Sequence, residues 1–169
     1  MEIRPHVHVY YNKVVTIGDV DLILSTLWSR IDLKEAFATE RCVTDFHRIA
    51  YNGETLTFAE FNDEHDRCLQ FIKKAVESSV AKHKVVVTHH VPSFALSSPD
   101  FERSDINGAF TVELGNYIAN SDIEYWIYGH SHRNIDREIG ATKCVSNQLG
   151  YIFQGENKSF RHDALIEIR

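Results

Sequence analysis

The sequence predicts an α/β fold in which helices pack against a mixed β-sheet. A capping box at Thr57 and Glu60 opens a long amphipathic helical pattern over residues 57–82. Two short apolar runs, residues 84–88 and 123–128, have the composition of strands buried on both faces. A helix followed by a parallel strand, twice over, is typical of open α/β sheets, which bind ligands at the carboxyl ends of their strands.

Length and composition place residues 1–169 in one globular domain. Hydrophobic residues make up 43% of the chain and charged residues 25%, which excludes a disordered protein. The longest apolar runs, such as residues 85–87, are far below the roughly 18 needed to cross a bilayer, and the first residues do not resemble a secretion signal. We therefore expect no membrane contact and a cytoplasmic location.

Charge and cysteine content exclude two further classes. The formal net charge of -6 provides no basic surface for a nucleic-acid backbone, so no nucleic-acid partner is expected. The three cysteines are widely spaced and contain no C-x-x-C motif, which indicates neither a disulfide framework nor a zinc knuckle.

The amino-terminal third predicts a β-hairpin or meander. Apolar and polar residues alternate over residues 7–11, and strand-like runs follow at residues 14–17 and 20–24. Residues 26–30 end the last of these strands. Residues 31–53 follow neither periodicity and are predicted as a loop with short helical pieces.

The remaining elements follow the long helix in short succession. Residues 93–110 are rich in polar residues and glycine and are predicted as a surface loop; Trp28 and Trp126 are predicted as core residues. A short helix is expected at residues 112–120. Short strands are expected at residues 135–139, 142–146, 151–153 and 164–168.

Both predicted buried strands end in histidines. His89 and His90 follow the first, and His130 and His132 follow the second. Neutral imidazole is a good ligand for zinc, iron and manganese-like ions. Gly129 is expected to let the backbone turn so that both following histidines face one cavity. The pattern predicts that the rings converge on metal or phosphate chemistry.

The histidine motifs resemble those of the calcineurin-like metallophosphoesterases. In that family a strand ends in T-H-H-x-P-S, as at residues 88–93, and a later strand ends in G-H-x-H, as at residues 129–132. Further similarity occurs at residues 26–29, 45–49 and 146–151.

The resemblance implies a partial layered α/β sandwich and a site that binds divalent Mn, Fe or Zn, dinuclear in the complete family site. It implies that His89 and His130 hold one metal and that His132 holds the other. His90 would face the phosphate or lie behind the ligands. Such metal pairs clamp phosphate oxygens and lower the pKa of a bridging water.

The family's earlier motifs, D-x-H, G-D and G-N-H-[DE], have no counterpart in the expected places. Short matches at residues 18–19, 45–47, 63–65 and 115–116 lie in the wrong context and are taken as coincidence. The chain thus corresponds to the carboxyl-terminal portion of such a domain. It lacks the bridging carboxylate, the asparagine ligand and the general acid that the family uses.

Three functions remain open at this point. The first is a metal-dependent hydrolase of small phosphomonoesters or phosphodiesters, impaired in this chain. The second is a non-catalytic remnant that forms a homodimer through the surface left by the missing half. The third is an incomplete enzyme completed by another chain. Absent inner strands would leave an apolar sheet face open, which favours association.

Overall fold

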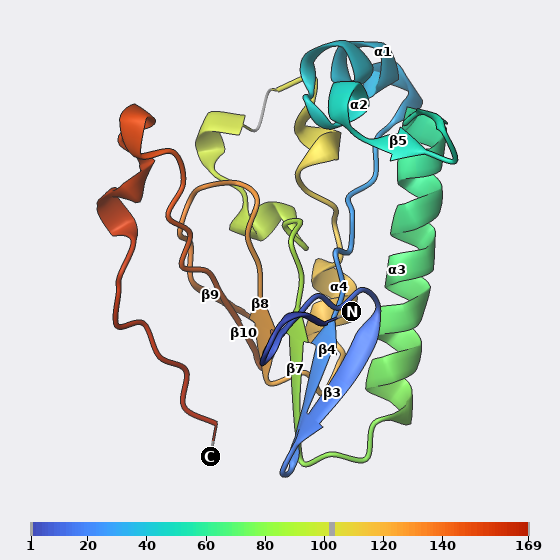
Figure 1. Cartoon of the computed structure of the whole chain (residues 1–169). Helices are drawn as coiled ribbons and strands as arrows, with labels where there is room; N and C mark the ends of the chain where they lie inside the picture. The colour runs from blue at the N-terminus through green and yellow to red at the C-terminus, as the bar shows by residue number, and fades with distance from the viewer. Residues whose placement is uncertain (1, 102–103, 169) are drawn as a thin grey trace.

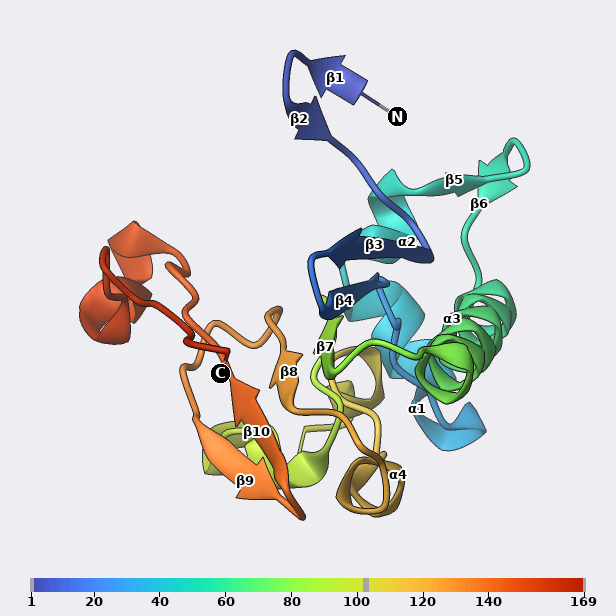
Figure 2. The ribbon, with the colours of Figure 1, turned by 90° about the horizontal axis from the view of Figure 1, so that it is seen from below.

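The protein is built on one six-stranded mixed sheet. The computed structural model describes residues 2–101 and 104–168, and the predicted surface loop at 93–110 is therefore described except for residues 102–103. The strands lie in the order β3-β4-β7-β8-β10-β9 (Figures 1 and 2). Their bounds are β3 (Lys13–Ile17), β4 (Val20–Leu24), β7 (His83–Val87), β8 (Tyr125–Ile127), β9 (Arg137–Ile139) and β10 (Thr142–Val145).

The four central strands are parallel and in register. Leu24 of β4 lies opposite Val87 of β7, which lies opposite Ile127 of β8, which in turn lies opposite Val145 of β10. All four strands therefore end at the same edge of the sheet. The two outer strands, β3 and β9, are antiparallel to their neighbours.

Helices α3 (Phe58–Ser78) and α4 (Gly115–Ala119) cover one face of the sheet, as Figure 2 shows in a view turned by 90°. The alternation of each strand directs Ile23, Val86 and Trp126 into this interface, and all three are fully buried. The α3 side of the core comes from its apolar stripe, which includes Ile72 and Val76.

A smaller apolar cluster lies beyond the carboxyl ends of the parallel strands. It contains Phe46 and Phe61, which stack with ring centroids 5.7 Å apart. Helices α1 (Leu33–Cys42) and α2 (Asp45–Arg48), together with 3-10 turn η3 (Asn107–Ala109), surround it. This cluster covers the edge of the sheet at which the predicted histidines lie.

Two small antiparallel ribbons lie outside the main sheet. Strands β1 (Glu2–Arg4) and β2 (Val7–His8) form one of them, and β5 (Ala50–Tyr51) and β6 (Glu54–Thr55) form the other. Tyr11, in the link between the first ribbon and β3, contacts α3: its hydroxyl contacts the Glu64 carboxylate and lies 3.3 Å from the Cys68 sulfur.

The structure confirms the α/β class and most of the predicted elements, with three corrections. Residues 151–153 are not a strand but lie at 3-10 turn η4 (Ile152–Gln154). Residues 164–168 have the composition of a strand yet pair with none. Helix α3 ends at Ser78, four residues before the predicted end, and Val80, predicted as part of its apolar stripe, is fully exposed. In each case the structure provides no neighbouring surface against which the predicted strand or helical turn could pack.

The capping box of α3 provides a test of local stability. The Thr57 hydroxyl accepts from the Glu60 N–H at 3.4 Å, and the Glu60 carboxylate accepts from the Thr57 N–H at 2.9 Å. Thr57→Ala should lower the free energy of unfolding by about 1 kcal/mol in urea titration. Thr44→Ala at the start of α2 is the matched control, because the Thr44 side chain makes no capping bond. Equal losses in the two variants would contradict this assignment.

Candidate functional site

Three loops meet at the common carboxyl edge of the parallel strands. Backbone hydrogen bonds join them: the N–H groups of His89 and His90 both donate to the Thr26 carbonyl at 3.3 Å, and the Gly129 N–H donates to the His89 carbonyl at 3.0 Å. The loops after β4, β7 and β8 are therefore fixed to one another by main-chain bonds.

This geometry brings the predicted histidines from two strands together. The ring centroids of His89 and His130 are 4.6 Å apart, and those of His90 and His130 are 4.5 Å apart. His89 is exposed, whereas His90 is only 2% exposed, because adjacent residues leave the strand in opposite directions. His132 lies further along the same loop, and its charge affects the pKa of both His89 and His130.

His90 forms the inner wall of the site. Its Nδ1 donates to the Thr26 carbonyl at 3.3 Å, and its ring stacks on Trp28 at a centroid distance of 5.6 Å. Its Nε2 is buried and has no hydrogen-bond partner among the described residues. Because an unpaired buried nitrogen costs free energy, this arrangement is one that stability alone does not favour.

His130 is held from two sides. Its ring stacks on Phe110, with centroids 4.7 Å apart and planes 20° from parallel. The backbone of Ala109 also acts on this ring, because it raises the pKa of His130 against the larger effect of burial.

His132 is oriented by a carboxylate that sequence analysis did not identify. Its Nδ1 donates to Oε2 of Glu156 at 2.9 Å, and its backbone N–H donates to the Gln148 side chain at 2.8 Å. The Nε2 atom of His132 is thereby left as the free acceptor of the ring. No local signal marks Glu156, which is 24 residues away in the chain.

The backbone of the site is strained. Leu27, Trp28, His130 and His132 all have positive φ angles, at 69°, 51°, 70° and 52° respectively. Non-glycine residues in this region cost on the order of 1 kcal/mol or more each and cluster at functional sites. The expected role of Gly129 is wrong: its φ is not positive, and the turn is made by the two histidines themselves.

Loss of surrounding water favours the neutral form of these rings. It lowers the pKa of His89, although this residue is partly exposed, lowers that of the buried His90 well below its usual value and lowers that of His130 to about 4. The positive charge that each ring would carry lowers the pKa of its neighbours further. The negative charge of the Asp45 carboxylate on α2 acts in the opposite direction and raises the pKa of His89. Neutral imidazole is the form that binds metals.

The donor chemistry of the site fits a metal ion, but the arrangement is incomplete. His132 has one ring nitrogen engaged by a carboxylate acceptor, as metal-binding histidines do. Within residues 2–101 and 104–168, however, no three His, Cys, Asp or Glu side chains form a group that could hold a metal ion. Most metal sites need at least three protein ligands.

The structure also shows where the G-D match at residues 18–19 and the two tryptophans lie. Gly18 and Asp19 form the turn between β3 and β4, at the opposite end of the sheet from the histidines. Trp126 is a core residue as expected, while Trp28 is only partly buried and lines the site.

Comparison with known proteins finds one relative in sequence and a solved structure with a similar fold. No protein-family model matches the chain. An uncharacterized protein of Acanthamoeba polyphaga mimivirus is 28% identical over 175 residues, which include 97% of this chain and 61% of that protein. The chain thus spans about three fifths of the length of this relative. A solved crystal structure shares the fold with a TM-score of 0.51 over 85% of this chain and 47% of its own, at 14% identity.

None of the helices in the described ranges combines the length and the apolar character that crossing a membrane requires.

The low pKa of His130 predicts how stability depends on pH in metal-free buffer. Between pH 6.5 and about 4 the unfolded chain binds a proton at this position that the folded chain does not, so stability falls as the pH drops through this window. The loss attributable to His130 is at most about 3 kcal/mol. His130→Asn should flatten the decline in the free energy of unfolding, measured in urea at several pH values. His162→Asn, which removes an exposed ring, controls for the loss of a histidine, and an unchanged slope in His130→Asn would contradict the assignment.

Proposed function

We propose that this chain carries the histidine-bearing part of a metal-dependent phosphoester hydrolase site. The observation that carries the proposal is the convergence of His89 and His130 from two separate strands, with ring centroids 4.6 Å apart. The strained backbone and the lowered pKa values of the rings support it, since both kinds of perturbation cluster at functional sites.

The positions of the four histidines suggest a separate role for each in this proposal. His89 and His130 would hold one divalent ion, and His132 would hold a second, with its Nδ1 fixed by Glu156 at 2.9 Å. His90 would orient His130 from behind, because it is buried and in ring contact with it. A bound metal would supply an activated water and neutralise the charge of a phosphate.

The described histidines do not make a complete catalytic set. Among the described residues no three His, Cys, Asp or Glu side chains form a group that could hold a metal ion. The motifs that supply the bridging carboxylate and the general acid in the resembled family also have no counterpart in the expected places of the sequence. A missing general acid alone commonly costs 10²- to 10⁴-fold in rate. The proposal therefore separates metal binding, which the isolated chain retains, from turnover, which it largely lacks.

The first test measures both properties on the same protein. Isothermal calorimetry with Zn²⁺ and with Mn²⁺ should detect binding that His130→Ala weakens by at least tenfold, because one of two ligands of the first ion is lost. Hydrolysis of p-nitrophenyl phosphate and of its bis-ester should remain close to the buffer rate.

His47→Ala is the control, since this ring lies on α2 and contacts the Arg41 carbonyl at 3.1 Å. Absence of metal binding in the unmodified chain would contradict the proposal. Rapid hydrolysis abolished by Asp45→Asn would instead show that the site is complete and that Asp45 is a ligand.

A second candidate function is self-association, and the incompletely covered face of the sheet favours it. Val85 and Tyr125 on this face are buried. The residues of the same face nearer the strand ends or the edge are only partly buried, namely Leu22, Leu24, Val87, Ile127 and Val145. The long helix α3 lies on the other face, and the carboxyl-terminal segment passes over this one (Figure 2).

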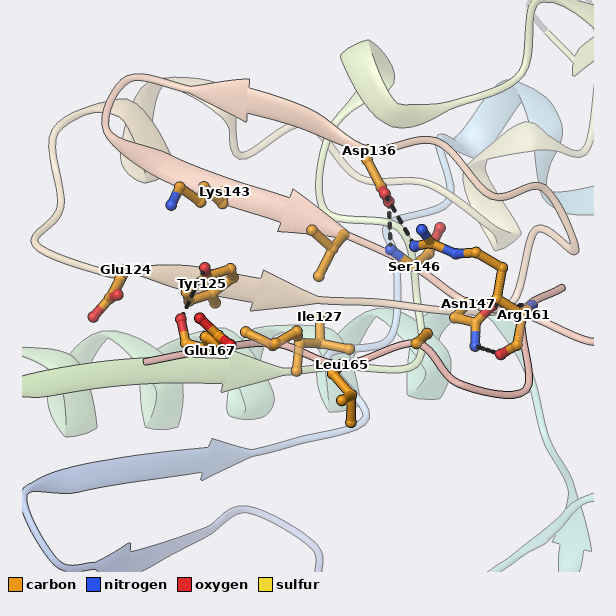
Figure 3. Close-up of a pocket in the computed structure, with 13 residues that line it drawn as sticks. Glu124, Tyr125, Ile127, Asp136, Lys143, Ser146, Asn147, Arg161, Leu165 and Glu167 are labelled. Atoms are coloured by element: carbon orange, nitrogen blue, oxygen red, sulfur yellow. Dashed lines mark hydrogen bonds and ion pairs between the residues drawn. The ribbon is translucent and has the colours of Figure 1, made fainter. Parts of the chain in front are cut away.

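The carboxyl-terminal segment covers this face loosely. Figure 3 shows the cavity between the segment and β8 and β10, with a volume of about 520 Å³. The segment is tied by hydrogen bonds between Asn147 and Arg161 and by the Tyr125 hydroxyl, which donates to the Glu167 carbonyl at 3.3 Å. Leu165 between these ties is 90% exposed. An apolar face with such loose cover is a common site of protein contact.

Light scattering tests this candidate directly. Association through the open face should give about twice the 19.5 kDa mass of the chain at micromolar concentration. Leu22→Lys should yield monomers, because a charge on this face cannot be buried in a dimer without a partner. Leu33→Lys on α1 is the control, since Leu33 is already 79% exposed on another surface. A monomeric unmodified chain would contradict self-association.

A further inference from the structure

An exposed pair of aromatic rings lies beside His132. The Tyr151 ring meets the His132 ring edge to face, with centroids 4.7 Å apart, and the Phe153 ring follows at 5.4 Å from Tyr151. Tyr151 is 52% exposed and Phe153 is 83% exposed. Both belong to the orange-red segment around η4, at the upper left of Figure 1. We call Tyr151 and Phe153 the aromatic pair.

The aromatic pair is fixed relative to the histidine by a single carboxylate oxygen. Oε2 of Glu156 accepts from Nδ1 of His132 at 2.9 Å and from the Tyr151 backbone N–H at 2.6 Å. The hydrogen bond from the Tyr151 N–H lowers the pKa of Glu156, and the bond from His132 lowers it further. The carboxylate therefore stays ionised. The position of the ring pair and the orientation of the histidine are therefore set together.

Gly150 makes this arrangement possible. Its φ of +62° is in the left-handed region, and a Cβ built there would lie 2.6 Å from the Glu156 Cβ and 3.2 Å from the His132 Cβ. Only glycine allows the chain to pass this close to both residues while turning. The loop is thus built to bring Tyr151 against His132 and does not merely expose apolar side chains at random.

Rings exposed beside a phosphate site have a definite chemical use. Aromatic side chains stack on flat aromatic groups, and each stacked base is worth about a tenfold gain in affinity or more by alanine substitution. The large exposure of Phe153 leaves such a face open to a ligand. A group stacked there would lie next to His132, where the proposed function places a phosphoryl group.

We propose that Tyr151 and Phe153 form a subsite for a flat aromatic ring carried by the phosphoester, as in a nucleoside monophosphate. The inference rests on the proposed function for the phosphate and on the aromatic pair for the ring. The substrate class is thus defined by the aromatic ring, which is the part of the substrate that is not hydrolysed. Small phosphoesters without an aromatic ring, such as sugar phosphates, would not stack on this pair.

Calorimetry with four probes in the presence of Mn²⁺ tests the two parts separately. The probes are adenosine 5′-monophosphate, ribose 5-phosphate, adenosine and inorganic phosphate. The monophosphate should bind about tenfold more tightly than ribose 5-phosphate, and adenosine alone should bind weakly. Phe153→Ala should abolish this preference and the binding of adenosine while leaving the affinity for ribose 5-phosphate unchanged.

Two control variants sharpen the result. Phe37→Ala removes a ring that is 77% exposed on α1 and should leave every affinity unchanged. Phe153→Trp should retain the preference, because it preserves a ring.

The outcomes distinguish the subsite from the proposed function. Binding of adenosine, lost in Phe153→Ala, without binding of either phosphate would leave the aromatic subsite standing and refute the phosphoesterase proposal. Equal affinity for the monophosphate and ribose 5-phosphate, or no effect of Phe153→Ala on their ratio, would overturn the subsite. Loss of a dimer in Phe153→Ala, with no binding of adenosine, would overturn it in favour of a contact between copies of the chain.

Discussion

The common register of four parallel strands is the constraint on which the rest of the structure depends. Leu24, Val87, Ile127 and Val145 end their strands opposite one another, so the loops that follow start at one edge. The ladder is held by main-chain bonds and by a fully buried layer that includes Trp126. The Trp126 indole also donates to the Thr88 hydroxyl at 3.0 Å, which links the core to the residue before the histidines.

The edge created in this way is the least relaxed part of the molecule. It contains non-glycine residues with positive φ, a buried His90 nitrogen without a partner among the described residues, and rings whose burial opposes protonation. The positive φ angles and the unpartnered nitrogen lower stability, and the ring burial does so once the pH falls below about 6.5. The surrounding core and the apolar cluster around Phe46 and Phe61 must offset these costs. A purely structural edge would have no reason to concentrate them. Their coincidence is the physical basis of the proposed site.

The two faces of the sheet differ in what they offer. The helical face is closed by α3 and α4, whereas the opposite face lies half-exposed under a segment tied at its two ends. The 520 Å³ cavity on that face is lined by none of the four predicted histidines. This cavity reflects the loose cover of the sheet face, whereas the reactive groups lie at the strand ends. The aromatic pair extends the second of these surfaces, since Glu156 joins it to His132.

Sequence alone determined the class of fold and the location of the histidines. The β-branched run at residues 84–88 and the capping box at Thr57 are local patterns, and both correspond to elements of the structure. Parallel strands place their carboxyl ends together, so adjacent rings could be expected from strand order. Only the tertiary structure decided that Glu156 binds His132, that Asp45 acts on His89, and that residues 164–168 remain unpaired. These outcomes depend on which surfaces meet across long stretches of chain, and a local pattern of polarity contains no information about its partner.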